Sequence, residues 1–235
     1  MVFRPIKSTK VYEQVIDQIK SMIVDGTLKK GDRLPSEREL VEHLEVSRTS
    51  VREAIRSLQI MGLIECRQGE GNFINQNFEN TLLEPISIMY MLQKNNPEEI
   101  LDVRKIIETG TVVLAAKKIN ESELKGLKDI ADAFKVCRNE EDNVRFDKEF
   151  HYKIAKASGN LLIVNILNAM SSLMDSFLKD ARKKILVDEE NVIVLANQHE
   201  LIYEAIRDGD EVRASEEMKK HLDFTNEYMR RTVNK

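Results

Sequence analysis

Residues 34–75 read LPSERELVEHLEVSRTSVREAIRSLQIMGLIECRQGEGNFIN, and this stretch decides the fold of the first third of the chain. Residues 36–39 (Ser-Glu-Arg-Glu) form a Ser-x-x-Glu capping box after a proline, which predicts the start of a helix. We expect that helix to end near Leu44. After a tight turn, Ser47 is placed to cap a second helix that extends to about residue 61. This order is typical of a helix-turn-helix.

The segments on either side complete the unit. Residues 10–25 carry apolar side chains at helical spacing and are followed by Gly26, so they predict an earlier helix. Residues 63–66 and 72–74 have the composition of two short strands, and the glycines between them suit a hairpin tip. Three helices followed by a hairpin predict a winged helix-turn-helix, which we assign to residues 1–75.

The helix that Ser47 caps has two chemically different sides. One side is apolar and is expected to pack on the core: Val51, Ala54, Ile55 and Leu58. The other carries arginines spaced four residues apart: Arg48, Arg52 and Arg56. Guanidinium groups suit phosphates and guanine edges, and hydroxyl donors stand at the start of the helix: Ser47, Thr49 and Ser50. The pattern predicts a DNA-recognition helix, although arginines at this spacing also suit a solvated face with i, i+4 ion pairs.

Bulk composition neither supports nor excludes nucleic-acid binding. The formal net charge is −4, and residues 1–75 hold 12 Lys and Arg against 11 Asp and Glu, so only the local arrangement of charge is informative. No apolar run approaches the roughly 18 residues of a membrane span, and the first ten residues carry no signal-peptide pattern. Cys66 and Cys137 form no CxxC pair. We expect a cytoplasmic protein with no membrane contact.

Residues 76–81 are polar and aperiodic, and we interpret them as a linker. Residues 82–235 are expected to form an all-helical domain of six or seven helices, so the whole chain is mainly α. The periodicity places its helices at 82–94, 97–119, 121–137, 142–157, 160–186, 189–208 and 210–232.

Four polar residues in this helical domain lie on otherwise apolar helix faces. Asp147 and His151 are one turn apart on one expected helix, and His199 and His221 lie on the last two. A buried carboxylate is costly unless it is paired or bound to a metal, and carboxylate with imidazole is ordinary metal chemistry. The pattern suits a metal site or, alternatively, hydrogen-bonded core histidines. The fourth histidine, His43, lies apart and is expected at the surface or in local packing.

The motifs at 34–40 and 46–54, with Gly62-Leu63-Ile64 and the glycines of the hairpin, resemble the DNA-binding domain of the GntR family. The resemblance implies operator contacts by Arg38, by Arg48 and Arg52, and by the wing glycine Gly69. The turn often has glycine where this chain has Glu45. A left-handed backbone conformation at that position costs a non-glycine residue about 1 kcal/mol or more.

Residues 82–230 resemble the effector domain of the FadR subfamily, called the FCD domain. Its metal-binding members carry Asp-x-x-x-His on one helix and two further histidines, which implies a metal site at Asp147, His151, His199 and His221. The resemblance also implies that Arg104, in Leu-x-x-Arg-x-x-x-Glu, neutralises the carboxylate of an effector. The alternative for Arg104 is an intrahelical pair with Glu108.

Together these features predict a homodimeric regulator, a repressor rather than an activator, that binds a palindromic double-stranded operator. A small carboxylate would act at a divalent metal, zinc first, with nickel or manganese as alternatives. A metalloregulator that senses the ion itself is a second hypothesis. A metal-dependent enzyme fused to a DNA-binding domain is the third, but His199-Glu200 lacks the second histidine of HExxH because residue 203 is Tyr.

Overall fold

The chain folds into two units, and the structure describes most residues of each. The computed structural model describes residues 10–76, 83–92, 96–137 and 139–233. The chain divides into two compact units, Met1–Thr81 and Leu82–Lys235. Apart from Gln76, the expected linker lies outside the described residues.

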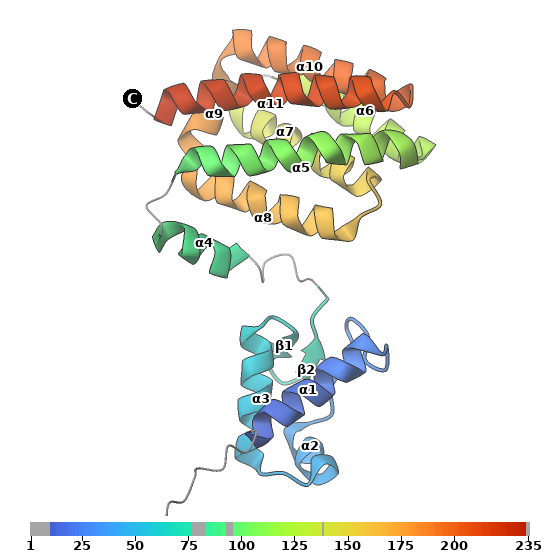
Figure 1. Ribbon diagram of the computed structural model, residues 1–235, viewed down its shortest axis with the longest axis vertical. Helices are drawn as coiled ribbons and strands as arrows, with labels where there is room; N and C mark the ends of the chain where they lie inside the picture. Colours follow the sequence, from blue (N-terminus) through green and yellow to red (C-terminus); the bar gives the residue numbers. More distant parts are fainter. Residues whose placement is uncertain (1–9, 77–82, 93–95, 138, 234–235) are drawn as a thin grey trace, which may run out of the picture. The chain divides into compact units, whose positions relative to one another are not determined.

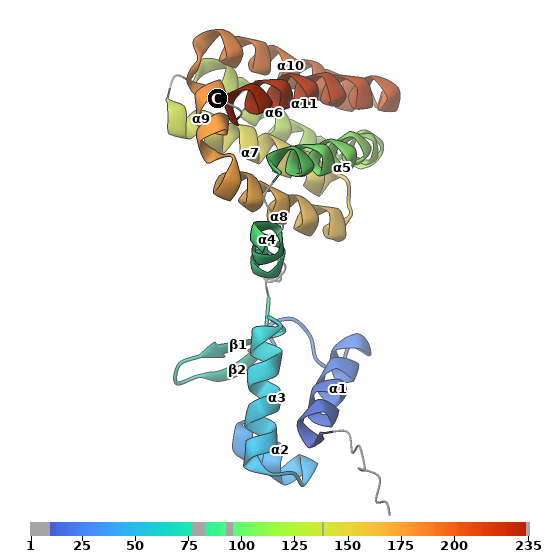
Figure 2. The same cartoon turned by 60° about the vertical axis from the view of Figure 1, so that its left-hand side comes forward.

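The first unit contains three helices and one hairpin (Figure 1). The helices are α1 (Val11–Val24), α2 (Glu37–Leu44) and α3 (Arg48–Ile60). Strands β1 (Ile64–Arg67) and β2 (Gly71–Ile74) pair antiparallel, with Ile64 opposite Ile74 and Arg67 opposite Gly71. Figure 2 shows the hairpin extending to one side of α3. This is a winged helix-turn-helix, as the sequence predicts.

Local hydrogen bonds explain where α2 and α3 begin. The Ser36 hydroxyl accepts from the backbone N–H of Glu39 at 3.2 Å, and the Glu39 carboxylate accepts from the Ser36 N–H at 2.8 Å. The Ser47 hydroxyl caps α3 by accepting from the Ser50 N–H at 3.1 Å. Between the helices Glu45 has φ 52° and ψ 38°. The left-handed turn is therefore formed here without glycine.

The apolar side of α3 lies in the core of this unit. Val51, Ala54, Ile55 and Leu58 pack with residues of α1 and of the hairpin: Val15, Ile16, Ile19, Ile64 and Ile74. Because one side of α3 is fixed in this core, its opposite side is held at the surface.

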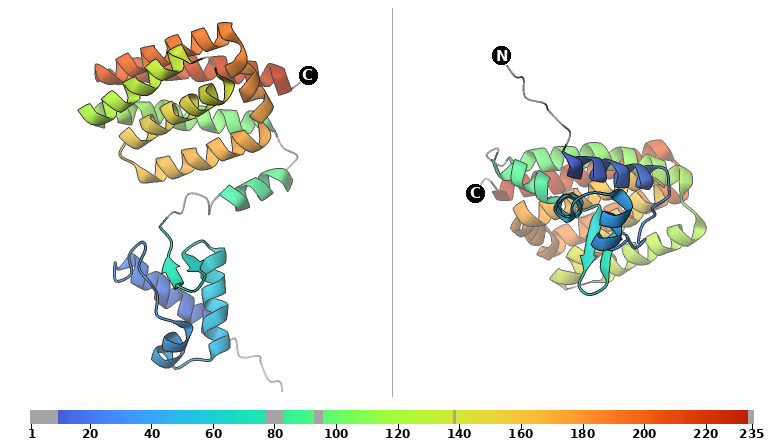
Figure 3. Two further views of the ribbon diagram at one scale, coloured as in Figure 1. Left: turned by 180° about the vertical axis from the view of Figure 1, so that it is seen from behind. Right: turned by 90° about the horizontal axis from the view of Figure 1, so that it is seen from below.

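The second unit consists, in its described residues, of helices alone. They are α4 (Leu83–Leu92), α5 (Pro97–Lys118), α6 (Glu121–Val136), α7 (Glu140–Ala157), α8 (Leu161–Phe177), α9 (Lys179–Val187), α10 (Glu189–Arg207) and α11 (Glu211–Val233). α5 packs against α11 on one side and against α8 on another, while α6 and α7 cover the face seen from behind (Figure 3).

The segment 160–186, expected as one helix, is instead two helices that meet at Leu178 with a bend of 88°. The hydroxyls of Ser172 and Ser176 bond to carbonyls one turn back, a contact that bends helices. Leu178, Ile185 and other apolar side chains are then buried on both sides of the bend. Among the described residues no single helix is long and apolar enough to cross a membrane; α8 with α9 meets that test only as a bent pair, by length and composition.

The largely apolar core of this unit also holds a group of buried charged side chains and histidines. Phe150 and Ile154 of α7 pack with Ile202 of α10 and with Met218 and Leu222 of α11. The buried side chains that carry a charge or an imidazole are Arg104, Glu108, Asp147, His151, Arg182, His199 and His221. Their contacts define the candidate site.

Candidate functional site

The four predicted metal ligands are brought together from three helices. Asp147 and His151 come from α7, His199 from α10 and His221 from α11. One potential ligand atom from each lies within 4.8 Å of all the others, and all four side chains are buried. His43 belongs to α2 of the other unit and is exposed.

The distances show a shared centre with few direct hydrogen bonds. The Nε2 atoms of His151 and His221 are 3.1 Å apart. Oδ1 of Asp147 lies 3.8 Å from Nε2 of His151 and 3.6 Å from Nε2 of His199. Both carboxylate–imidazole distances are longer than a hydrogen bond. The carboxylate oxygen and the ring nitrogens therefore face one another without direct hydrogen bonds between them.

Glu108 on α5 holds the far side of the His151 ring, because its Oε2 lies within hydrogen-bond reach of His151 Nδ1. Its Oε1 accepts from Nε of Arg104 at 2.5 Å. Burial raises the pKa of Glu108, but Arg104 and His151 outweigh it and lower that pKa to about 2. The carboxylate is therefore ionised and accepts only, so His151 Nδ1 carries the hydrogen. The intrahelical pair of Arg104 with Glu108 is present, while effector binding by Arg104 stays a prediction.

Gln198 on α10 occupies the equivalent position behind His221. Its Oε1 lies 3.0 Å from Nδ1 of His221. Burial, followed by the neighbouring His199 and His151, lowers the pKa of His221 well below its usual value. The ring is therefore neutral at pH 7, with its one hydrogen on Nδ1 donated to the amide oxygen.

These hydrogen positions leave a lone pair on Nε2 of His221. When His151 is neutral as well, two lone pairs face each other across 3.1 Å, with no hydrogen to join them. Such a contact is unfavourable in a buried site unless a cation or a proton lies between the rings. The donor set thus fits a metal ion.

Arg182 on α9 binds the other oxygen of Asp147, with Nη2 2.8 Å from Oδ2. Burial raises the pKa of Asp147, but contacts with His199 and with Arg182 outweigh it and hold that pKa well below its usual range. Arg182 also forms an ion pair with Asp175 at 3.5 Å, and Asp175 in turn pairs with Lys148. Asp147 is therefore ionised, with Oδ1 left toward the histidines.

His199 has no exposed surface, and neither ring nitrogen has a hydrogen-bond partner among the described residues. Its ring stacks on Phe150, with centroids 4.2 Å apart and planes 24° from parallel, and Phe134 contacts it edge-on. Burial lowers the pKa of His199, against the opposing effect of Asp147. A buried imidazole without hydrogen bonds is costly, and a metal at Nε2 would satisfy one of its nitrogens.

Sequence reasoning missed Arg182 and Gln198. Arg182 follows Leu178 by four residues and precedes Ile185 by three, which puts it on an apolar stripe, but reading 160–186 as one helix hid its direction. Gln198 is next to His199 in sequence and carried no signal of its own. Its role follows only from the packing of α10 on α11.

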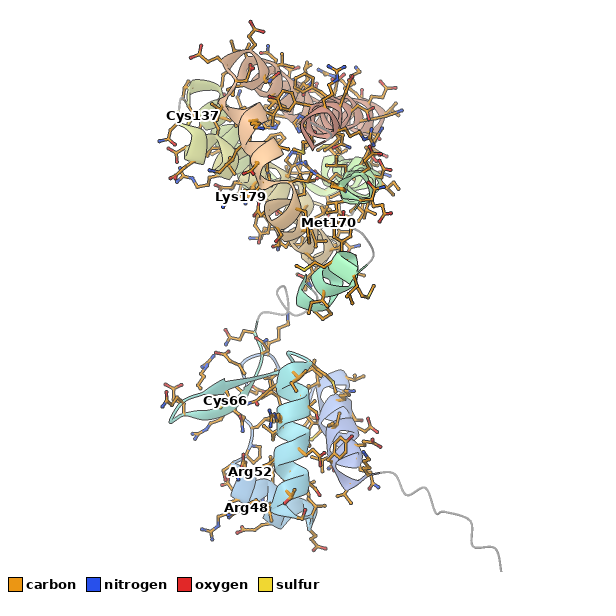
Figure 4. All side chains as sticks on the ribbon, turned by 90° about the vertical axis from the view of Figure 1, so that its left-hand side faces the viewer. Arg48, Arg52, Cys66, Cys137, Met170 and Lys179 are labelled. Atoms are coloured by element: carbon orange, nitrogen blue, oxygen red, sulfur yellow. The ribbon has the colours of Figure 1, made fainter. Side chains whose placement is uncertain are left out.

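The predicted DNA-contacting residues lie together at the surface of the first unit. Figure 4 shows Arg48 and Arg52 at the end of α3 nearest α2. Arg48, Arg52 and Arg56 are exposed, and Arg52 Nε bonds Oε2 of Glu37 at 2.8 Å. Arg38 pairs with Glu42 at 3.0 Å. Arg48 and Arg56 have no ion pair within the part of the chain that the structure describes.

The hydroxyl residues at the start of α3 differ in availability. Thr49 is exposed, whereas the side chain of Ser47 is engaged as the cap and lies 2.9 Å from the Ser50 hydroxyl. In the hairpin, Gly69 is exposed with φ 79°, and nothing would meet a Cβ there within 4 Å. A substitution at Gly69 is therefore disfavoured by backbone conformation alone.

Both parts of the chain match described families. Residues 11–74 match the bacterial regulatory proteins of the gntR family, and residues 99–224 match the FCD domain. The transcriptional regulator LutR of Bacillus subtilis is 35% identical over 203 residues, which cover 86% of this chain and 93% of LutR. The putative L-lactate dehydrogenase operon regulatory protein of Escherichia coli K12 is 28% identical and covers 94% of this chain and 87% of its own length.

Solved structures show the same fold. Streptococcus agalactiae GntR superposes with a TM-score of 0.68 at 24% identity, covering 92% of this chain and 99% of that one. McbR/YncC of Escherichia coli gives a TM-score of 0.52 at 16% identity, covering 96% and 100%. The sequence relatives are transcriptional regulators, which confirms the prediction of a regulator rather than an enzyme. The chain belongs to the GntR family, as a DNA-binding transcription regulator with a winged helix-turn-helix and an FCD domain.

Proposed function

We propose that this regulator is a homodimeric repressor that binds a palindromic operator through the exposed side of α3 and the tip of the wing. Arg48 and Arg52 would read the major groove, Arg38 and Thr49 with the backbone near Ser47 and Ser50 would contact the DNA backbone, and Gly69 would let the wing approach closely. Two copies related by a two-fold axis match a palindromic site. A regulator of bacterial transcription would act in the cytoplasm, where the operator is.

The second part of the proposal is that Asp147, His151, His199 and His221 hold a divalent metal ion. The single observation that carries it is the convergence of one ligand atom from each of these four buried residues to within 4.8 Å of one another, with both ring nitrogens of His199 left without a hydrogen bond among the described residues. Three imidazole nitrogens and one carboxylate oxygen suit zinc in tetrahedral geometry, or nickel or manganese with further open positions.

The third part is that a small carboxylate binds beside the ion and changes operator affinity. The buried charges support it, because Arg104 and Arg182 are balanced by Glu108 and Asp147. A divalent ion would leave the site two positive charges in excess, which favours an anion over a neutral ligand. Arg104 is the predicted partner of the carboxylate and would share its guanidinium with Glu108. One relative is named as a regulator of an L-lactate dehydrogenase operon, and lactate is a small carboxylate.

A pure metalloregulator is the competing function. The unfavourable Nε2–Nε2 contact favours it, because filling the site with an ion would by itself change how α7 and α11 pack. In that case the ion is the signal and no organic ligand is needed.

Operator affinity separates these functions when metal and acid are titrated independently. In a gel shift with metal-loaded protein, we expect small carboxylates to change the dissociation constant for operator DNA by five-fold or more. Metal alone should leave it within about two-fold. A response to metal alone, with none to any acid tested, would establish the metalloregulator instead.

A further inference from the structure

Gln198 is a hydrogen-bond partner of His221 that is neither buried nor charged. It is partly exposed on α10, directly before His199, and its Oε1 lies 3.0 Å from Nδ1 of His221. Glu108 makes the corresponding contact with His151 from α5. His199, the third histidine, has no such partner among the described residues.

This contact decides which nitrogen of His221 carries the hydrogen. A neutral imidazole has one N–H and one lone pair, and a hydrogen bond to one nitrogen selects the tautomer. An amide oxygen accepts and does not donate, so it places the hydrogen on Nδ1. Without Gln198, the nearest partner for His221 would be Nε2 of His151, and a hydrogen on His221 Nε2 would turn the facing lone pairs into an ordinary hydrogen bond.

We propose that Gln198 is a positioning residue that fixes His221 as the Nδ1–H tautomer and so keeps its Nε2 available at the centre of the cluster. Loss of Gln198 lets His151 and His221 bond to each other, and that bond competes with an incoming ion. The consequence for metal affinity rests on the proposed metal site, whereas the consequence for the tautomer does not.

The test compares three variants as full-length protein. Gln198→Leu removes the acceptor at similar size, Gln198→Glu keeps an acceptor, and Asn197→Leu is the matched control at an exposed neighbour on the same helix. Long-range proton–nitrogen NMR on metal-free protein reports the tautomer of each ring, and the chain has only four histidines to assign. Competition with a chelator measures Zn²⁺ affinity, and thermal unfolding of the metal-free protein checks the fold.

We expect wild type, Gln198→Glu and Asn197→Leu to hold His221 as the Nδ1–H form, and Gln198→Leu to shift it toward Nε2–H. Zn²⁺ affinity should fall about 10- to 100-fold in Gln198→Leu and stay within a few-fold in the other two, with unfolding temperatures unchanged. An unchanged tautomer in Gln198→Leu overturns the inference. If wild type binds no Zn²⁺ but the tautomer shifts in Gln198→Leu, the metal site fails and the positioning role stands. If Gln198→Leu binds Zn²⁺ as tightly as wild type, the role in metal binding is overturned.

Discussion

Arg182 and Asp147, 35 residues apart and on different helices, form a buried, hydrogen-bonded ion pair of 2.8 Å in the helical unit. The side chains are 4% and 7% exposed, so neither charge is screened by water. The pair leaves one oxygen of Asp147 directed at the histidines. The ion pair forms because the chain bends at Leu178, so that α9, which carries Arg182, packs against α7, which carries Asp147.

Replacing Arg182 by Leu should destabilise the metal-free protein by about 3–5 kcal/mol, because a buried carboxylate loses its cation. The free energy of unfolding from urea denaturation measures this. The control is Arg145→Leu on α7, whose ion pair with Asp142 is exposed, where about 0–1 kcal/mol is expected. If the two variants lose equal free energy of unfolding, the buried pair of Arg182 with Asp147 contributes no more to stability than an exposed ion pair.

The stability losses caused by replacing Asp147 and Arg182 should not be additive. Asp147→Asn keeps the size of the side chain but removes the charge that Arg182 balances, so the double variant with Arg182→Leu should be more stable than the sum of the single losses predicts. A double-mutant cycle in urea gives this coupling energy, and strict additivity would mean that the two residues do not interact.

The turn of the helix-turn-helix should become more stable when Glu45 is replaced by Gly. Glu45 has φ 52°, and glycine adopts this region without the penalty of about 1 kcal/mol that a side chain brings. Glu45→Val should have the opposite effect, because a β-branched residue fits the left-handed region poorly. Thermal unfolding monitored by circular dichroism ranks the three proteins; the order Gly, Glu, Val from most to least stable is expected, and a Glu45→Gly protein less stable than wild type would contradict it.

DNA binding should depend on Arg48 and Arg52 and not on exposed arginines of the helical unit. Arg48→Ala and Arg52→Ala should each abolish operator binding in a gel shift without loss of folding, since both side chains are exposed. Arg207→Ala, an exposed arginine of the other unit, removes the same charge and should bind like wild type. Retained binding by both recognition-helix variants would refute the role of α3.

Glu37 should weaken the contact that Arg52 makes with DNA. Its carboxylate now accepts from Arg52 Nε, so Glu37→Gln frees the guanidinium and removes a negative charge beside the DNA. Binding to non-operator DNA at low salt should tighten, and the ratio between operator and non-operator affinity should fall. An unchanged ratio would show that the Glu37 pair has no part in discrimination.

Much of this architecture follows from short-range signals. The Ser36–Glu39 capping box, the Ser47 cap and the glycines of the hairpin depend only on neighbouring residues. They predict the helix starts of the first unit to within about one residue. The four candidate ligands were predicted because each interrupts an apolar stripe, and burial of the stripes brings them together.

The remaining features depend on contacts between distant helices. The bend at Leu178 has no proline or glycine to mark it, and without the bend the pairing of Arg182 with Asp147 cannot be foreseen. Gln198 sits beside a predicted ligand, but its contact with His221 joins residues 23 apart on two helices. Periodicity tells which residues face inward, whereas it does not tell which of them meet.

The metal content of the purified protein tests the central proposal most directly. Elemental analysis of protein prepared without chelator should give about one divalent ion per chain for wild type and almost none for the double variant His151→Ala/His199→Ala, with the fold of both checked by circular dichroism. Absence of an ion from wild type, or full retention by the double variant, would contradict a metal centre at Asp147, His151, His199 and His221.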